Sequence, residues 1–291
     1  MGLLLITRFT LLEAIRRRLF LAVIILSLLI LGAFTLLLAV VINVSLANNN
    51  SSTDPQLFLL GGGIFVTVMA IWMVYLLSST LTIVLTAGMI SLEIEAGTFA
   101  IIVPKPLARA EIIFGKWLGY ALIVTLYTAF MFLSFLAVIY WQTGYWPLNA
   151  FSALVMLDLC MLALLALTTL GGTLVPTMVN GAIALMLFIG APTASIVQFI
   201  VQFLRPTQSM LVQNITTVIN LIIPTDALWH GVSYYLLPSA DVFVAVGVNP
   251  QNFNTPFTSA QPVAPALIIW VLSYCTVLPV LAAWRFQNRD L

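Results

Sequence analysis

The chain has 291 residues, of which 62% are hydrophobic and only 7% are charged, against roughly a quarter charged in ordinary soluble domains. This composition excludes a soluble globular domain and indicates an integral membrane protein. The formal net charge of +1 gives no reason to expect nucleic acid as a partner, because the basic residues do not form an extended solvated face.

Apolar windows long enough to cross a bilayer recur along the chain. A hydrocarbon core of about 30 Å requires about 20 apolar residues per helix, whereas a lipid-spanning β-barrel would alternate apolar and polar residues. We therefore predict an all-α polytopic membrane protein that forms a single transmembrane domain over residues 1–291. The six predicted spans lie near 19–43, 60–90, 113–141, 149–175, 180–203 and 263–284.

The segment ahead of the first span, residues 3–18, is predicted to form a short helix. Leu4, Leu11 and Ile15 share one stripe, which suits an N-terminal helix lying at the cytoplasmic membrane interface. The alternative is that this segment extends the first span into the cytosol. The apolar run over 19–42 is longer than the roughly 7–15 residues of a signal peptide, so we expect an uncleaved first span.

The connection between the second and third spans gathers both signs of charge together with prolines and glycines. Pro104 and Pro106 must end any helix that continues from the second span. A new helix after them would carry Arg109 and Lys116 on one face, because these residues are seven positions apart. We predict a cytoplasmic helix–break–helix element over residues 91–112.

Two interpretations of this element stay open from the residues alone. It is either an ordinary loop whose solvated basic residues orient the chain, or a docking surface for another protein. The orientation of the chain requires only the basic residues, so it does not explain the acidic residues or the rigid prolines. A docking surface explains both.

Asp158, in the fourth span, is the one clear charge inside a predicted span. Ionisable residues at membrane depth mark ion or substrate pathways by default, although a structural hydrogen bond or an interfacial position are alternatives here. Cys160 and Cys275 also fall inside apolar spans, where we expect small buried side chains rather than a disulfide.

Residues 205–262 do not read as a plain loop. The segments 209–224 and 226–238 are apolar enough to enter the membrane but too short or too polar to cross it comfortably. We predict outer re-entrant or interfacial helices that cap the bundle, because irregular backbone at membrane depth must be covered by protein or water. The alternative is a transmembrane pair, which would give eight spans.

The lysines and arginines of the short loops predict the orientation. With six spans, Arg205 alone among ten basic residues falls on the outer side, so both termini are predicted to be cytoplasmic. The outer side then receives the loop 48–54 and a tight turn near Trp141, Tyr145 and Trp146, aromatic residues that suit an interfacial belt.

Motifs of common active sites are absent from the sequence. The single histidine, His230, excludes paired-histidine metal motifs such as H-E-x-x-H, and no G-x-S-x-G nucleophile elbow occurs. The P-loop pattern G-x-x-x-x-G-K-S/T fails around Lys116, because Ala110 replaces the first glycine and Trp117 the hydroxyl residue. We expect no catalytic residue, metal site or bound cofactor, and hence no enzyme.

One ordered set of residues runs through the charged element and into the third span: E-x-E-x-G-T, an apolar run, P-x-x-R and then G-K. It is similar to the cytoplasmic loop of type-2 ABC transporter permeases. The motif covers only residues 93–119; elsewhere the similarity is one of layout, in the spans, termini and outer helices. The matching residues are Glu93, Glu95, Gly97, Thr98, Pro106, Arg109, Gly115 and Lys116.

This resemblance implies the transmembrane permease subunit of an ATP-driven ABC exporter in the plasma membrane. The element 91–112 would act as a coupling element that docks into a separate ABC ATP-binding subunit, which would hold ATP and Mg²⁺. A second permease chain, identical or different, would complete the transporter.

The resemblance also implies roles for single residues of the element. Lys116 has two candidate partners, the ATPase and a lipid phosphate. Gly97 would give the backbone freedom for a turn, and Thr98 would cap the following segment. Ionic contacts with the ATPase are expected from Glu93, Glu95, Arg109 and Glu111.

The alternative function is a stand-alone secondary carrier or channel, which would transport its substrate without an ATPase. The apolar spans do not identify the cargo, because contact with lipid already requires them. The direction of transport, export, rests on the resemblance alone.

Overall fold

The computed structural model describes residues 2–16, 18–47, 55–89, 109–204, 209–238, 255–259 and 261–287. Over these ranges the chain is helical, with one isolated bridge between Thr255 and Thr258, so the predicted all-α class is confirmed. The helices are α1 (Gly2–Arg16), α2 (Arg18–Ala47), α3 (Pro55–Thr86), α6 (Arg109–Thr143), α7 (Ala150–Leu174), α8 (Thr177–Leu204), α9 (Ser209–Ile222), α10 (Thr225–Leu236) and α12 (Pro265–Gln287).

Six helices within the described ranges are long and apolar enough to cross a membrane. The longest, α6, has 35 residues; at about 1.5 Å per residue it exceeds a bilayer core of about 30 Å, because it begins in the polar segment ahead of its apolar part. The portions that meet this criterion are Phe20–Val44, Gly61–Thr86, Ala110–Thr143, Ala150–Leu174, Thr177–Gln202 and Pro265–Gln287.

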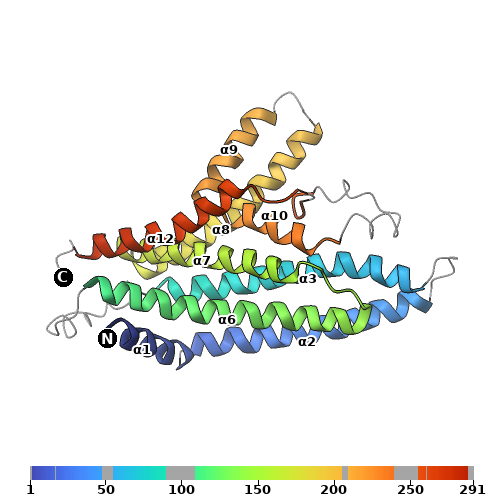
Figure 1. Cartoon of the computed structure of the whole chain (residues 1–291), viewed down its shortest axis with the longest axis horizontal. Coiled ribbons are helices and arrows are strands. Elements are labelled where there is room, and N and C mark those ends of the chain that lie inside the picture. The colour runs from blue at the N-terminus through green and yellow to red at the C-terminus, as the bar shows by residue number, and fades with distance from the viewer. Residues whose placement is uncertain are drawn as a thin grey trace.

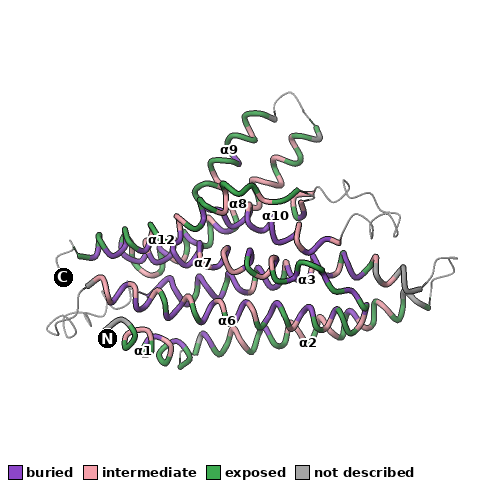
Figure 2. The backbone as a smooth tube through the Cα atoms, viewed as in Figure 1, coloured by how far each residue is buried: buried purple, intermediate pink, exposed green. Residues whose placement is uncertain are grey.

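The core of the bundle is formed by α3, α6 and α7 (Figures 1 and 2). Of the most apolar part of α3, 61% is buried in the protein, against 11% for α2 and 17% for α8. α7 packs against α6, α10 and α12, and α6 packs against α1 and α3. The outward faces of α2 and α8 are therefore surfaces for lipid or for another chain.

Two shorter helices, α9 and α10, meet at a break and are bent by 94° to each other. Pro224 lies in the break, where its missing N–H and its ring prevent α9 from continuing. α10 packs into the bundle against α7, whereas α9 lies beside α8 and projects from the bundle (Figure 1). Such a bent pair is either a broken span or a re-entrant loop.

The turn between α6 and α7 corrects one expectation for the aromatic residues. Gly144 adopts φ 72°, a left-handed conformation that glycine allows without strain. Trp141 and Trp146 are exposed, but Tyr145 is only 6% exposed and its hydroxyl donates to the carbonyl of Leu236 at 2.8 Å. Tyr145 therefore joins the turn to the end of α10 and does not belong to an interfacial belt.

The N-terminal helix α1 packs along α6 through small polar residues. Thr10 is buried against Gly119, and the Thr7 hydroxyl donates to the Gly115 carbonyl at 3.1 Å. Leu4, Phe9 and Ile15 of α1 face away from the protein, whereas Leu11, expected on the same stripe as Leu4 and Ile15, packs against the core together with Ile6. This arrangement agrees with a helix whose apolar side contacts lipid.

Candidate functional site

Helix α6, which carries three of the predicted docking residues, begins at the end of the bundle where both chain termini lie (Figure 1). Arg109 is the first residue of α6, and Glu111 lies in its first turn and is partly exposed. Lys116 follows two turns later in the same helix. Outside the described residues lie Glu93, Glu95, Gly97, Thr98 and Pro106.

Lys116 is buried, at 7% exposure. Its Nζ donates a hydrogen bond to the carbonyl of Met89 at 3.1 Å. Met89 follows the end of α3, where main-chain carbonyls lack partners within the helix, and a lysine near a helix C-terminus suits both that need and the helix dipole. In this structure Lys116 therefore links α6 to the end of α3.

Asn180, in the first turns of α8, makes a second link to the end of α3. Its Nδ2 donates to the carbonyls of Ala87 and Thr168, each at 2.9 Å. Beside it, the hydroxyls of Thr86 and Thr168 form a hydrogen bond of 2.7 Å between α3 and α7. We name Lys116, Asn180 and the carbonyls of Ala87 and Met89 the α3 clasp.

Sequence reasoning missed Asn180 because the connection ahead of α8 carries no charge. A signal was present: an asparagine lies near the start of an apolar helix, four residues after Pro176 and nine residues after Gly171. Inside a membrane bundle a small residue such as Gly171 lets helices approach closely, and a polar residue such as Asn180 hydrogen-bonds across them.

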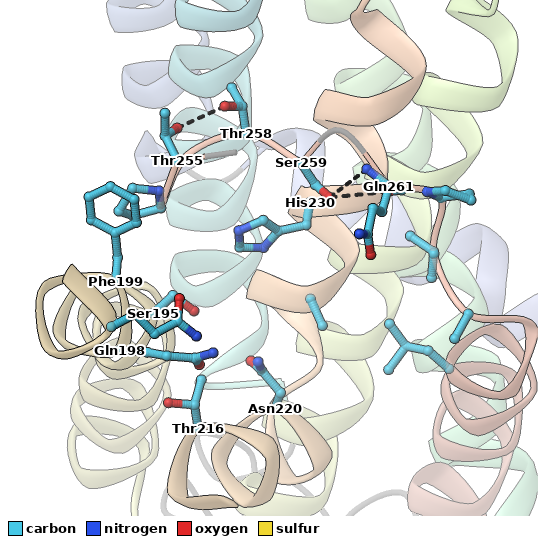
Figure 3. Close-up of a pocket in the computed structure, with 17 residues that line it drawn as sticks. Ser195, Gln198, Phe199, Thr216, Asn220, His230, Thr255, Thr258, Ser259 and Gln261 are labelled. Atoms are coloured by element: carbon cyan, nitrogen blue, oxygen red, sulfur yellow. Dashed lines mark hydrogen bonds between the residues drawn. The ribbon is translucent and has the colours of Figure 1, made fainter. Parts of the chain in front are cut away.

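A polar cavity of about 480 Å³, here called the vestibule, lies between α8, α9, α10 and the segment that leads into α12. Figure 3 shows side chains from three helices pointing into it, among them Gln198, Asn220 and His230. Hydroxyl and amide groups dominate its lining, which includes Ser195, Gln198, Gln202, Thr216, Asn220, His230, Thr255, Thr258, Ser259 and Gln261.

The wall of the vestibule is fixed to α10 by two hydrogen bonds. The indole Nε1 of Trp229 donates to the carbonyl of Phe257 at 2.8 Å, and the backbone N–H of Ser259 donates to the Ser233 hydroxyl at 3.1 Å. Both α10 residues are fully buried, so the covering segment is held in a defined place.

Asp226 lies behind two residues that line the vestibule, Ser195 and His230, and is fully buried. Its Oδ2 accepts a hydrogen bond from the Ser195 hydroxyl and lies 3.8 Å from His230 Nδ1. His230 Nδ1 is also 2.9 Å from the main-chain carbonyl of Asp226. Because a carbonyl only accepts, Nδ1 carries the proton and Nε2 is the ring nitrogen left to face the vestibule.

Asp158, the predicted pathway residue, lies in α7 and is partly buried; its Oδ1 is enclosed without a hydrogen-bond partner. It does not line the vestibule. Sequence reasoning overlooked Asp226 because its segment was assigned to the outer helices and not to a span. Within the described residues no group of three or more His, Cys, Asp or Glu side chains gathers as a metal site, and Cys160 and Cys275 are buried and free, as predicted.

A comparison with protein families matches residues 6–291 to the model described as "ABC-2 family transporter protein". The match spans nearly the whole chain, including every described transmembrane helix and the charged element between α3 and α6. A comparison with curated proteins finds no match.

Proposed function

Because the chain belongs to the ABC-2 family of transporter proteins, and is thus a multi-pass permease of an ABC transporter, we propose that it is the transmembrane subunit of an ATP-driven exporter. ATP hydrolysis takes place in a separate ABC ATP-binding subunit, which holds ATP and Mg²⁺. The absence of the P-loop motif from the sequence supports this division of labour.

The coupling element 91–112 is the proposed contact with the ATPase. Its mixed charges lie between two apolar helices of a chain with only 7% charged residues, and a surface with both signs of charge can fix the register of a partner. Glu93, Glu95, Arg109 and Glu111 make these contacts in our proposal, on the cytoplasmic side of the plasma membrane, where both termini also lie.

The α3 clasp gives this contact a route into the membrane. Closure of the ATPase pair would push on the coupling element, which follows Met89. Lys116 links Met89 to α6, and Asn180 links Ala87 to α7 and α8. A displacement of the end of α3 is therefore shared by four helices. Two permease chains, identical or different, complete the transporter, and Asp158 stays a candidate pathway residue.

The docking proposal is tested by reversing two charges at once, Glu93→Lys with Arg109→Glu. In membranes that contain the cognate ATPase, we expect the double variant to lose the ATPase on co-purification, or to keep it without stimulated ATP hydrolysis. The helical fold should persist, because each substitution replaces one charged side chain by another and leaves the apolar spans unchanged. Circular dichroism and the thermal unfolding midpoint check that point.

A matched control reverses Asp54→Lys and Arg205→Glu, on the side predicted to face away from the ATPase. This variant should bind and stimulate the ATPase like the natural chain. Unchanged assembly and ATP hydrolysis in the Glu93/Arg109 variant would count against docking. Transport by the purified chain alone under an ion gradient would favour the secondary carrier instead.

A further inference from the structure

Three buried side-chain oxygens near the break between α9 and α10 have no hydrogen-bond partner: the Tyr75 hydroxyl, the Thr225 hydroxyl and Oδ1 of Asp226. The exposed fractions of the three residues are 0%, 1% and 0%. A buried polar group without a partner costs about 1–3 kcal/mol. Three such oxygens close together indicate that a bound ion or water pairs with them.

The three oxygens belong to one place. Thr225 and Asp226 are consecutive in the first turn of α10, and the ring of Tyr75 on α3 packs against Trp229 of the same helix, with ring centroids 5.3 Å apart. The Tyr75 hydroxyl approaches the Thr225 side chain closely enough to interact with it. Since neither hydroxyl reaches hydrogen-bond geometry with the other, a small particle between them would satisfy both. We name Tyr75, Thr225 and Asp226 the break site.

The surrounding structure holds the break site in position. The Cys160 thiol, on α7, donates to the Thr225 carbonyl at 3.5 Å. From α12, Trp270 Nε1 and the Tyr274 hydroxyl donate to the carbonyls of Leu221 and Ile222, at 3.0 and 2.8 Å. These bonds occupy carbonyls that the end of α9 would otherwise leave unpaired, so the geometry of the break is fixed by two neighbouring helices.

The ring of Tyr75 is equally constrained. It packs against Trp72, Trp229 and Phe188, with ring centroids 5.2–5.3 Å apart. Aromatic packing of this kind fixes the direction of the hydroxyl. The tryptophans also place two fluorophores beside the site.

The carboxyl group of Asp226 has no lysine or arginine beside it, and the basic side chain next to it is His230, whose Nδ1 lies 3.8 Å from Oδ2. The sequence contains no lysine or arginine between Lys116 and Arg205, none between Arg205 and Arg285, and none in α3. Among the described residues, the groups that face the site include the Tyr75 hydroxyl from α3, the Cys160 thiol from α7, the Ser195 hydroxyl from α8 and His230 from α10 itself. Asp158 of α7 lies near the Cys160 thiol. An isolated buried carboxylate is costly unless a positive charge accompanies it.

We propose that the break site binds a small monovalent cation of the sodium type. Carboxylate and hydroxyl oxygens are hard ligands that suit such an ion, and one positive charge neutralises one carboxylate, whereas a divalent ion would leave a net charge in the apolar interior. The ion reaches the site from the vestibule, because Ser195 and His230 line that cavity and both contact Asp226.

The test uses the full chain in lipid nanodiscs, without any ATPase, so that it is independent of the proposed function. Na⁺ replaces choline at constant ionic strength and pH while the thermal unfolding midpoint and tryptophan fluorescence are recorded. A cation that binds the folded state raises the midpoint with concentration. We expect a saturable rise and a fluorescence change in Na⁺ and neither in choline.

Three variants and one control test whether the response to Na⁺ arises at the break site. Asp226→Asn should abolish it, and Tyr75→Phe and Thr225→Val, which each remove one oxygen, should raise the half-saturating Na⁺ concentration at least tenfold. Thr128→Val removes a buried unpaired hydroxyl from α6, away from the site, and should respond like the natural chain.

Two results with the natural chain would overturn the proposal. Equal behaviour in Na⁺ and choline would show that the site holds water. A midpoint that follows pH and ignores Na⁺ would identify a proton as the compensating charge. If Asp226→Asn does not fold, Tyr75→Phe and Thr225→Val decide the question, and an unchanged Na⁺ response in both would reject the site.

Discussion

Asn180 shows how one side chain can join three helices of this bundle. Asn180 belongs to α8, and its side-chain amide donates to the carbonyl of Ala87, just beyond the end of α3, and to the carbonyl of Thr168 in α7. Gly171 lies opposite, and a Cβ atom there would overlap Oδ1 of Asn180 and lie 3.1 Å from its Cγ. Asparagine and glycine are therefore needed together.

We predict that Gly171→Ala lowers the free energy of unfolding by about 1–3 kcal/mol, because the added methyl must displace an amide held by two hydrogen bonds. The measurement is the thermal unfolding midpoint in lipid. Gly190→Ala in α8 is the matched control, since no atom lies within 4 Å of the added Cβ. It should be neutral, or stabilising by about 0.5–1 kcal/mol. Equal behaviour of the two variants would refute the steric argument.

At the scale of the elements, the seam between α1 and α6 depends on close approach. A Cβ atom added at Gly119 would lie 2.9 Å from Cβ of Thr10, a distance that packed atoms do not tolerate, and 3.3 Å from the Thr7 carbonyl oxygen, which is a tight contact. The hydrogen bond from Thr7 to the Gly115 carbonyl lies on the same seam. Helix α1 thus approaches α6 closely through small residues, with Ile6 and Leu11 packed against the core and most of its other large apolar side chains exposed.

We expect Gly119→Val to release α1 from α6 without unfolding the bundle. Limited proteolysis should cut within α1 at least several-fold faster than in the natural chain, because a helix that loses its packing opens locally. Gly62→Val in α3, where no atom lies within 4 Å of the added Cβ, should leave the cleavage rate unchanged. If both variants are cleaved at the natural rate, the glycine is not what holds the seam.

On the scale of the whole molecule, both chain termini lie at the same end of the bundle (Figure 1). This arrangement requires an even number of crossings. In the part of the chain that the structure describes, six helices are long and apolar enough to cross, and counting the bent pair α9–α10 as one broken span would give seven. The position of the termini therefore favours a re-entrant α9–α10 pair.

Site-directed labelling checks this topology. Single reporter cysteines at Gly2 and Leu291, in a background of Cys160→Ala and Cys275→Ala, should react with a membrane-impermeant maleimide from one and the same side. A reporter at Ser51 should react from the opposite side. Termini that label from opposite sides would show that the bent pair crosses the membrane. The orientation rule further predicts that the side with the termini is cytoplasmic.

The sequence alone determined the features that depend on summed apolarity and on an ordered local motif. The class, the six membrane-crossing helices and the family followed from long apolar segments and from the E-x-E-x-G-T to G-K order, because lipid forces backbone hydrogen bonds inside each helix whatever its neighbours are. Even the break at Pro224 could be placed from local chemistry, since proline cannot continue a helix.

Only the tertiary structure decided which polar side chains meet. Tyr75 and Asp226 are 151 positions apart and the partners of Lys116 and Asn180 are main-chain carbonyls, so no spacing rule could pair them. Tyr145 was expected at the membrane surface and lies inside the protein. In an almost uniformly apolar chain hydropathy does not distinguish a lipid-facing position from a buried one, because both are apolar; packing alone makes that choice.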